Sequence, residues 1–225
     1  MHRWSRLAVT VFLVVFLGSC GGGSEVGQET SGSYCANVKG LSICTVSVMP
    51  NYLGTLDTPN YTTNVDVFQI ADCDPQQDGN QAEPFSDHTA IVTFNIRALN
   101  PYADIPPNTG IVLERYVIDY RVATDSIGAP PIERYEGYMS MAIPAPLSTA
   151  TALDVRSFIT FVDLPRKDKY YDNLASGRYS SRGGLINNYV ATVTFYGRTD
   201  TGDRFSIVGN ASFSMGAYNY CNLRT

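Results

Sequence analysis

Apolar side chains recur at every second position over much of this chain, and this alternation restricts its fold more than any other feature of the sequence. Between residues 92 and 97, for example, Val92, Phe94 and Ile96 are separated by polar residues. A period of two places such side chains on one face of an extended strand, so the pattern predicts half-buried β-strands. Eight segments show it, near residues 41–49, 63–71, 92–97, 115–122, 134–143, 152–163, 189–195 and 205–213.

The composition of these segments favours strands over helices. Val, Ile and Thr fill them and Leu is sparse, as is typical of pleated, half-buried surfaces. Clusters of Pro, Gly and Asn separate them, and no helical repeat alternates with them, which argues against a parallel α/β sheet. The chain is therefore predicted to be all-β: an antiparallel β-sandwich of about eight strands, in one domain over residues 34–225. The last two strands should form a hairpin across Asp200–Asp203, where Gly202 suits a tight turn.

The first 33 residues do not fit this pattern. Arg3 and Arg6 precede an apolar run over residues 7–17, which is the layout of an export signal and is too short to span a bilayer. Residues 21–33 are rich in Gly and Ser and cannot bury a core. We expect residues 20–33 to be a flexible tether with a root-mean-square reach of about 20 Å.

The end of the apolar run carries a specific motif. The residues Leu17, Gly18, Ser19 and Cys20 resemble the lipobox of bacterial lipoproteins. The resemblance implies that residues 1–19 are a signal peptide and that Cys20 is acylated and becomes the new N-terminus. Gly21 stands where an aspartate tends to retain members of this family in the inner membrane, so the resemblance also implies an outer-membrane location. It leaves open which face of that membrane the domain occupies.

The charge of the chain argues against nucleic acid as a partner. Without residues 1–19, which hold two basic residues and no acidic ones, 14 basic residues remain against 21 acidic ones, a net charge of −7. No basic stripe suited to phosphates is present. The densest positive run, Arg166, Lys167 and Lys169, is interrupted by Asp168 and is expected to be a solvated loop or a short helical turn.

Motifs for catalysis are scarce. His88 is the one histidine outside the signal, which excludes an HExxH metal site and leaves a single candidate base for a serine or cysteine hydrolase. No nucleophile elbow, P-loop or haem-attachment motif occurs. His88 is in phase with the inward series at Val92, so we expect a strand-end residue that a loop partly covers. The sequence thus favours a protein that is not an enzyme and has no cofactor.

One acidic loop has the spacing of a cation site. Side-chain oxygens occur at Asp74, Gln76 and Asp78, followed by Gly79, which resembles the first half of an EF-hand-like calcium loop. The second half departs from that pattern, because the twelfth position is Phe85 instead of a glutamate. Both calcium binding and a plain acidic turn remain open.

The four remaining cysteines are Cys35, Cys44, Cys73 and Cys221. In an oxidising compartment they should form two disulfides, for which three pairings are possible. If residues 41–49 and 63–73 form an antiparallel pair, Cys44 lies opposite Cys73, which leaves Cys35 for Cys221. We expect this pairing.

A second resemblance concerns the β-region. Tyr189 stands two residues before Ala191 near the start of the penultimate strand, where immunoglobulin-like folds place a corner tyrosine. Residues 90–225 are similar in this respect to bacterial immunoglobulin-like modules, although they lack the paired core cysteines and the core tryptophan. The resemblance implies an immunoglobulin-like sandwich.

These observations lead to two hypotheses of function. The first is a non-enzymatic lipoprotein, held at the membrane by its lipid, whose sandwich binds or supports another envelope component, with the loops 99–110 and 164–185 as contact sites. The alternative is a surface glycan-binding module or glycan-cleaving enzyme. The alternative expects a groove lined by tyrosines such as Tyr135, Tyr138, Tyr170, Tyr171 and Tyr179.

Overall fold

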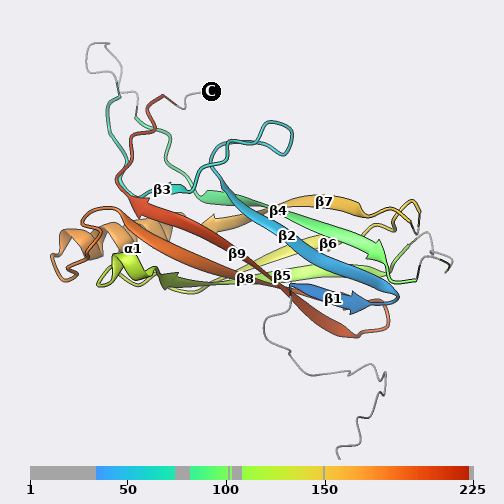
Figure 1. Ribbon diagram of the computed structural model, residues 1–225. Helices are drawn as coiled ribbons and strands as arrows, with labels where there is room; N and C mark the ends of the chain where they lie inside the picture. Colours follow the sequence, from blue (N-terminus) through green and yellow to red (C-terminus); the bar gives the residue numbers. More distant parts are fainter. Residues whose placement is uncertain (1–33, 74–81, 101, 103–107, 149, 223–225) are drawn as a thin grey trace, which may run out of the picture.

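The computed structural model describes residues 34–73, 82–100, 102, 108–148 and 150–222. These residues form two β-sheets packed face to face, with a helix at one end of the sandwich (Figure 1). The strands are β1 (Cys35–Val38), β2 (Leu41–Asn51), β3 (Asn64–Asp66), β4 (His88–Ala98), β5 (Ile111–Val122), β6 (Tyr135–Ala142), β7 (Leu153–Val162), β8 (Asn187–Thr199) and β9 (Arg204–Gly216). The helices are α1 (Leu164–Ala175) and a 3₁₀ turn, η1 (Thr124–Ser126).

The strand order confirms the predicted sandwich. One sheet has the order β1-β2-β4-β7 and the other β3-β9-β8-β5-β6. Neighbouring strands are antiparallel except for the short parallel pair of β3 and β9. The described residues form nine strands, because the four-residue strand β1 adds to the eight expected segments. At 12 residues, α1 is too short to cross a bilayer, and no helix in the described ranges is long and apolar enough to do so.

The core lies between the two sheets and contains the predicted alternating residues. Phe94 of β4 and Phe195 of β8 are fully buried and meet edge to face, with ring centroids 5.0 Å apart. Ile96 and Val193 are also fully buried. The β8–β9 hairpin is confirmed as well: Gly202 has a φ of +94°, and the Thr199 amide donates to the carbonyl of Asp203.

Tyrosine hydroxyls close one open edge of the sandwich. Strand β7 is the last strand of its sheet. The Tyr116 hydroxyl, which comes from the opposite sheet, accepts a hydrogen bond from the Thr160 amide at 2.9 Å and lies 3.2 Å from the Thr160 carbonyl. Gly137 of β6 makes this possible, since a Cβ there would lie 2.3 Å from the Tyr116 ring. The Tyr120 hydroxyl donates to the Phe161 carbonyl in the same way.

The segment 164–185 was expected to be a loop, but its first half is α1. Asp163 caps the helix by accepting a hydrogen bond from the Arg166 amide, and Pro165 occupies the first turn, where its missing N–H costs nothing. The helix turns Lys167 and Tyr170 into the protein, where both are buried. The expectation of a fully solvated basic run is therefore wrong for Lys167.

The four cysteines form two disulfides, as expected, but the predicted pairing is wrong. The bonds are Cys35–Cys44 and Cys73–Cys221, not Cys44–Cys73 and Cys35–Cys221. The reason is that β3 does not pair with β2. Strand β1 pairs with β2 and places Cys35 directly opposite Cys44. Strand β3 runs parallel to β9, so the segments that follow the two strands, with Cys73 and Cys221, leave the sheet at the same end.

Candidate functional site

Strands β2 and β9 lie next to each other on the side of the sandwich that is in front in Figure 1. A shallow groove crosses this side. It has two parts of about 380 and 390 Å³, which share Thr63 and Ser212. The first part is lined by Val48, Met49, Pro50, Tyr61, Thr62, Thr63 and Ser212. The second part is lined by Thr63, Ala123, Asp125, Asn188, Tyr189, Val190, Ser212, Phe213 and Ser214.

The groove exists because the short edge strands β1 and β3 cover only part of β2 and β9. Strand β1 pairs with β2 only as far as Cys44, and β3 pairs with β9 only from Ser214 onward. The two bare edges touch at Gly209, where a Cβ would lie 2.6 Å from a methyl group of Thr45. Beyond that contact, residues 61–63 bridge the sheets: the Thr62 amide donates to the Pro50 carbonyl at 3.1 Å, and the Ser214 amide donates to the Thr63 carbonyl at 2.8 Å.

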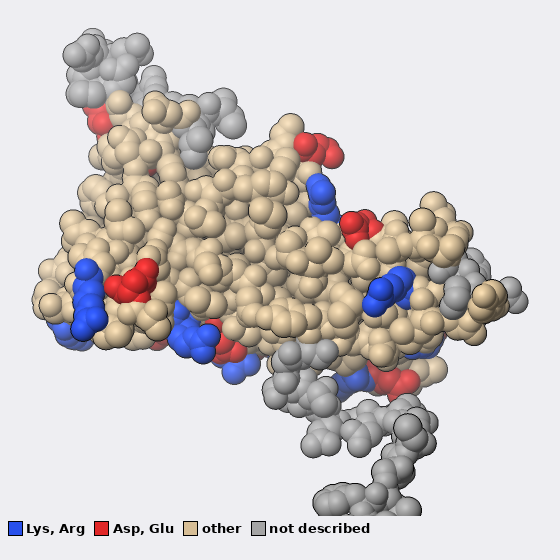
Figure 2. Space-filling model, viewed as in Figure 1, with Lys and Arg blue, Asp and Glu red and all other residues tan. Residues whose placement is uncertain are grey.

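The lining is mostly uncharged. Met49 and Tyr61 are each more than 40% exposed and offer apolar surface, while hydroxyl and amide groups line the rest. Asp125 is the one carboxylate among the lining residues, and it accepts a hydrogen bond from the Asn188 side chain at 2.8 Å. Figure 2 shows few charged side chains on this face over β2 and β9. Such a surface suits a neutral ligand or partner.

A buried cluster behind the groove holds its wall in place. His88 Nε2 lies 3.1 Å from the Thr62 carbonyl. Because a carbonyl only accepts, this nitrogen carries the proton. The Tyr220 hydroxyl donates to the Asn64 carbonyl, and the Ser214 hydroxyl donates to the Asn64 side chain at 3.1 Å. The exposed wall at residues 61–64 is thus fixed from the inside.

His88 is more deeply buried than the sequence predicted. It has no exposed surface and stacks on Tyr52, with ring centroids 5.3 Å apart. Burial, with the nearby Lys167 charge as a second cause, lowers the pKa of His88 to about 3, so the imidazole is neutral at physiological pH. A neutral, enclosed ring that hydrogen-bonds the backbone orders the chain and does not reach a substrate in the groove.

Lys167 and Asp66 are the charged members of this cluster. The Lys167 ammonium donates to the Ser86 carbonyl at 2.7 Å and lies over the rings of Tyr52 and Phe85. Burial lowers the pKa of Lys167 to about 8, against the opposing effect of carboxylates led by Asp66. Burial raises the pKa of Asp66 to about 6, although its carboxylate accepts hydrogen bonds from two backbone amides.

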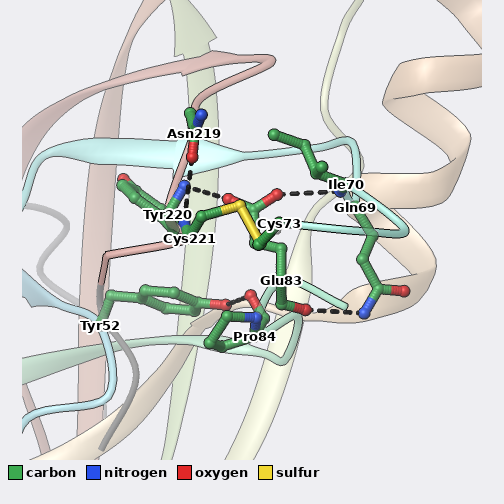
Figure 3. Close-up of a disulfide and its surroundings, with 9 residues drawn as sticks. All are labelled: Tyr52, Gln69, Ile70, Cys73, Glu83, Pro84, Asn219, Tyr220 and Cys221. Atoms are coloured by element: carbon green, nitrogen blue, oxygen red, sulfur yellow. Dashed lines mark hydrogen bonds between the residues drawn. A yellow bond between two sulfur atoms is a disulfide. The ribbon is translucent and has the colours of Figure 1, made fainter. Parts of the chain in front are cut away.

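The C-terminal segment is fastened to the same cluster (Figure 3). The Cys73–Cys221 disulfide joins it to the chain after β3. Beside the disulfide, the buried Glu83 carboxylate accepts hydrogen bonds from the amides of Ile70, at 2.9 Å, and Tyr220. The Tyr52 hydroxyl donates to the Pro84 carbonyl at 2.6 Å. Covalent and polar links thus hold the tail that carries Tyr220 against the groove wall.

The predicted site residues fall in different places. Cys20 and the possible calcium ligands Asp74, Gln76 and Asp78 lie outside the described residues. Within the described ranges, no cluster of three or more His, Cys, Asp or Glu side chains could hold a metal ion. The five tyrosines proposed for a glycan groove do not line this one. Tyr170 is buried, for example, and Tyr138 is 81% exposed on β6.

Among the groove residues that sequence reasoning missed, Tyr61 offers an exposed aromatic ring. It lies between two periodic segments and follows Pro59 and Asn60, so no pattern indicated that its side chain would line a site. Its position becomes clear only from the bridge that it forms with Asn51 at the end of β2.

Comparisons with known proteins give no family. No family model matches the chain, and no curated protein matches it. Among solved structures, the chain is similar to the solution structure of AT1g01470 from Arabidopsis thaliana, with 8% sequence identity over 60% of this chain and 76% of that one. The TM-score is 0.25, which is too low to support an inference about function.

Proposed function

We propose that this chain is a lipid-anchored outer-membrane protein without catalytic activity, which binds another component of the cell envelope in the groove between β2 and β9. The anchor is proposed from the lipobox resemblance at Cys20. The observation that carries the binding role is the groove itself: a mostly uncharged surface whose wall at residues 61–64 is held by His88, Tyr220 and a disulfide-linked tail. A preformed wall lowers the ordering cost of binding.

We also propose that the sandwich is immunoglobulin-like. Two packed, mainly antiparallel sheets support this, as does the position of Tyr189 near the start of β8. Tyr189 is buried and its hydroxyl donates to the Pro130 carbonyl at 2.7 Å. That acceptor is 59 residues away in sequence, whereas the corner tyrosine of immunoglobulin-like folds bonds the backbone a few residues upstream. Tyr189 therefore has the position of a corner tyrosine but not its hydrogen bond.

A neutral glycan is a second candidate for the ligand. Tyr61 offers an aromatic face for a sugar ring, and the hydroxyls of Thr63 and Ser212 and the amide of Asn188 can exchange hydrogen bonds with sugar hydroxyls. Cleavage of a glycan by the usual mechanism would require a pair of carboxyl groups, and Asp125 is the one that lines the groove. The lining therefore favours binding over cleavage.

The test is capture of envelope components by tagged protein, with Tyr61→Ser as the groove variant and Tyr138→Ser as its matched control. Both tyrosines are exposed, but only Tyr61 lines the groove. Proteins retained from solubilised envelopes would be identified by mass spectrometry and glycans by sugar analysis. We expect one component that Tyr61→Ser loses at least tenfold and Tyr138→Ser retains.

Two results would contradict the proposal. Equal retention by both variants would exclude the groove as the binding site. Release of reducing sugars from an envelope polysaccharide, abolished by Asp125→Asn, would establish the enzymatic alternative. The anchor is tested in the same strains, because Cys20→Ala should prevent labelling with a radioactive fatty acid and release the protein from the outer membrane.

A further inference from the structure

The end of the sandwich that carries α1 lies on the left in Figure 1. Four exposed apolar residues come from the segments at this end. These residues, which we call the apolar tip, are Phe68, Tyr171, Leu185 and Ile186, with exposed fractions of 43%, 38%, 72% and 46%. The ring of Phe68 stacks on that of Tyr171, with centroids 5.2 Å apart. Exposed apolar side chains that cluster in this way mark interaction sites more often than scattered ones do.

Phe68, Leu185 and Ile186 lie near the end of β9, and Tyr171 joins them through its contact with Phe68. A Cβ at Gly216 would lie 2.8 Å from the Ile186 side chain, so Ile186 packs against this glycine. The Gly216 carbonyl accepts a hydrogen bond from the Val67 amide at 3.1 Å, which places Phe68 next to the same residue. The residues of the apolar tip therefore come together at one end of the sandwich, from the chain after β3, from α1 and from the loop before β8.

The loop that presents Leu185 and Ile186 is held by the fold. The Arg182 amide donates to the Ile127 carbonyl at 3.2 Å, and the Ser181 hydroxyl donates to the side chain of the buried Asn187. Gly184 has a φ of +66°, a conformation that other residues rarely adopt. Two consecutive large apolar side chains thus project into solvent from a defined turn, although apolar burial would favour folding them inward.

The charges around this turn differ from those of the whole chain. Residues 164–186 contain five basic and two acidic residues. The acidic ones, Asp168 and Asp172, are exposed on α1 near Tyr171, whereas the loop after the helix has the exposed Arg178 and Arg182 and no carboxylate. The chain after removal of residues 1–19 has a net charge of −7. Apolar side chains beside arginines are the combination that binds the interface of a bilayer with anionic lipids.

The proposed anchor also lies within reach. Tyr34, the first described residue, contacts Asn210 of β9 through its hydroxyl at 2.5 Å. Six residues of strand separate Asn210 from Gly216, a distance of about 20 Å. The 14 residues from Cys20 to Ser33 have a maximum extended length of about 48 Å. A lipid on Cys20 and the apolar tip can therefore occupy the same membrane.

We propose that the apolar tip is a membrane-contact surface, which inserts Leu185 and Ile186 into the headgroup region of an anionic bilayer while Arg178 and Arg182 meet the lipid phosphates. This inference rests on the proposed lipid anchor only for the nearness of the bilayer. A single anchor joined to the domain by the proposed tether would leave the domain free to rotate. Contact at the tip adds a second attachment, which fixes the orientation in which the groove is presented.

The test uses residues 20–225 with Cys20→Ala, so that any binding is independent of acylation. The protein is sedimented with vesicles of phosphatidylethanolamine and phosphatidylglycerol, and in parallel with pure phosphatidylcholine. We expect stronger binding to the anionic vesicles. The double variant Leu185→Ser/Ile186→Ser should bind about tenfold more weakly, since burying one such side chain contributes at least that factor. Leu147→Ser is the matched control, because Leu147 is fully exposed outside the tip.

A fluorescence measurement provides a second readout. The one tryptophan of the full chain is Trp4, so Leu185→Trp places a single tryptophan in the test protein. Its emission should shift to shorter wavelength on anionic vesicles. An unchanged spectrum, or equal sedimentation of wild type and the double variant, would overturn the proposal. Binding to native envelope membranes but not to protein-free vesicles would also overturn it and would indicate a protein partner. Failure of Cys20 to be acylated would leave the vesicle result intact and contradict only the anchor.

Discussion

At the scale of single residues, the protein buries Asp66, His88 and Lys167 behind the groove. Burial raises the pKa of Asp66 and lowers those of His88 and Lys167, and each shift favours the neutral form. Two polar atoms in this group, Asp66 Oδ2 and His88 Nδ1, have no hydrogen-bond partner among the residues that the structure describes. Such burial lowers stability. The same residues, however, form hydrogen bonds with the backbone at Thr62, Ser86 and Tyr218, and these bonds hold the groove wall and the tail in place.

The burial of His88 makes stability depend on pH. An unfolded histidine takes up a proton below pH 6.5, whereas His88 in the folded state stays neutral down to about pH 3. Its contribution is therefore present above pH 6.5 and is lost as the pH falls. Relative to His88→Phe, which keeps the ring against Tyr52, the free energy of unfolding of the wild type should fall by about 1–2 kcal/mol from pH 6.5 to 5. Urea unfolding at a series of pH values measures this, and parallel curves for the two proteins would refute it.

The sequence predicts the inward direction of His88 but not its depth. The period-two pattern from His88 to Ile96 sets the face on which the side chain lies. The residues that cover it, Tyr52 and Thr62, come from segments without a periodic pattern, so their approach depends on the tertiary fold. Tyr61 was missed for the same reason. Lys167 was misassigned because charged side chains are almost never fully buried, although Asp163 and Pro165 mark the start of a helix.

At the scale of elements, local periodicity identified most strands, whereas pairing depended on contacts between distant segments. Each of the long strands from β4 to β9 overlaps a predicted segment, because a strand buried on one face has alternating apolar and polar residues. Strand β1 has four residues, too few for a pattern. The wrong disulfide pairing came from the expectation that segments near in sequence pair with each other, whereas β3 pairs with β9, about 150 residues later.

The hydrogen bonds between the Tyr116 hydroxyl and the edge strand β7 can be tested by substitution. Tyr116→Phe removes the hydroxyl that lies between the amide and the carbonyl of Thr160, and should lower the free energy of unfolding by about 1–3 kcal/mol. The amide of Thr160 should also exchange faster with deuterium. Tyr138→Phe is the matched control, because this tyrosine on neighbouring β6 is 81% exposed and its change should leave stability within about 0.5 kcal/mol. Equal effects of the two variants would mean that the hydroxyl does not secure the edge.

At the scale of the whole molecule, the two disulfides act on separate parts of the chain. Cys35–Cys44 closes a short hairpin with a sequence separation of 9, whereas Cys73–Cys221 spans 148 residues and ties the chain after β3 to the C-terminal segment. The two loops do not overlap, so their effects on the unfolded chain should be independent. The long loop encloses strands of both sheets as well as α1, which makes its disulfide the principal covalent constraint on the sandwich.

We therefore expect the two disulfides to differ in their contribution to stability. Loop-closure entropy assigns about 5 kcal/mol to a separation of 148 and about 2.6 kcal/mol to a separation of 9. Cys73→Ser/Cys221→Ser should accordingly lose about twice as much free energy of unfolding as Cys35→Ser/Cys44→Ser in urea titrations. The first variant should also loosen the groove wall, because Tyr220 reaches Asn64 from the residue next to Cys221. Equal losses would show that the entropy of the unfolded chain does not set the effect, and a non-reduced peptide map joining Cys35 to Cys221 would contradict the pairing itself.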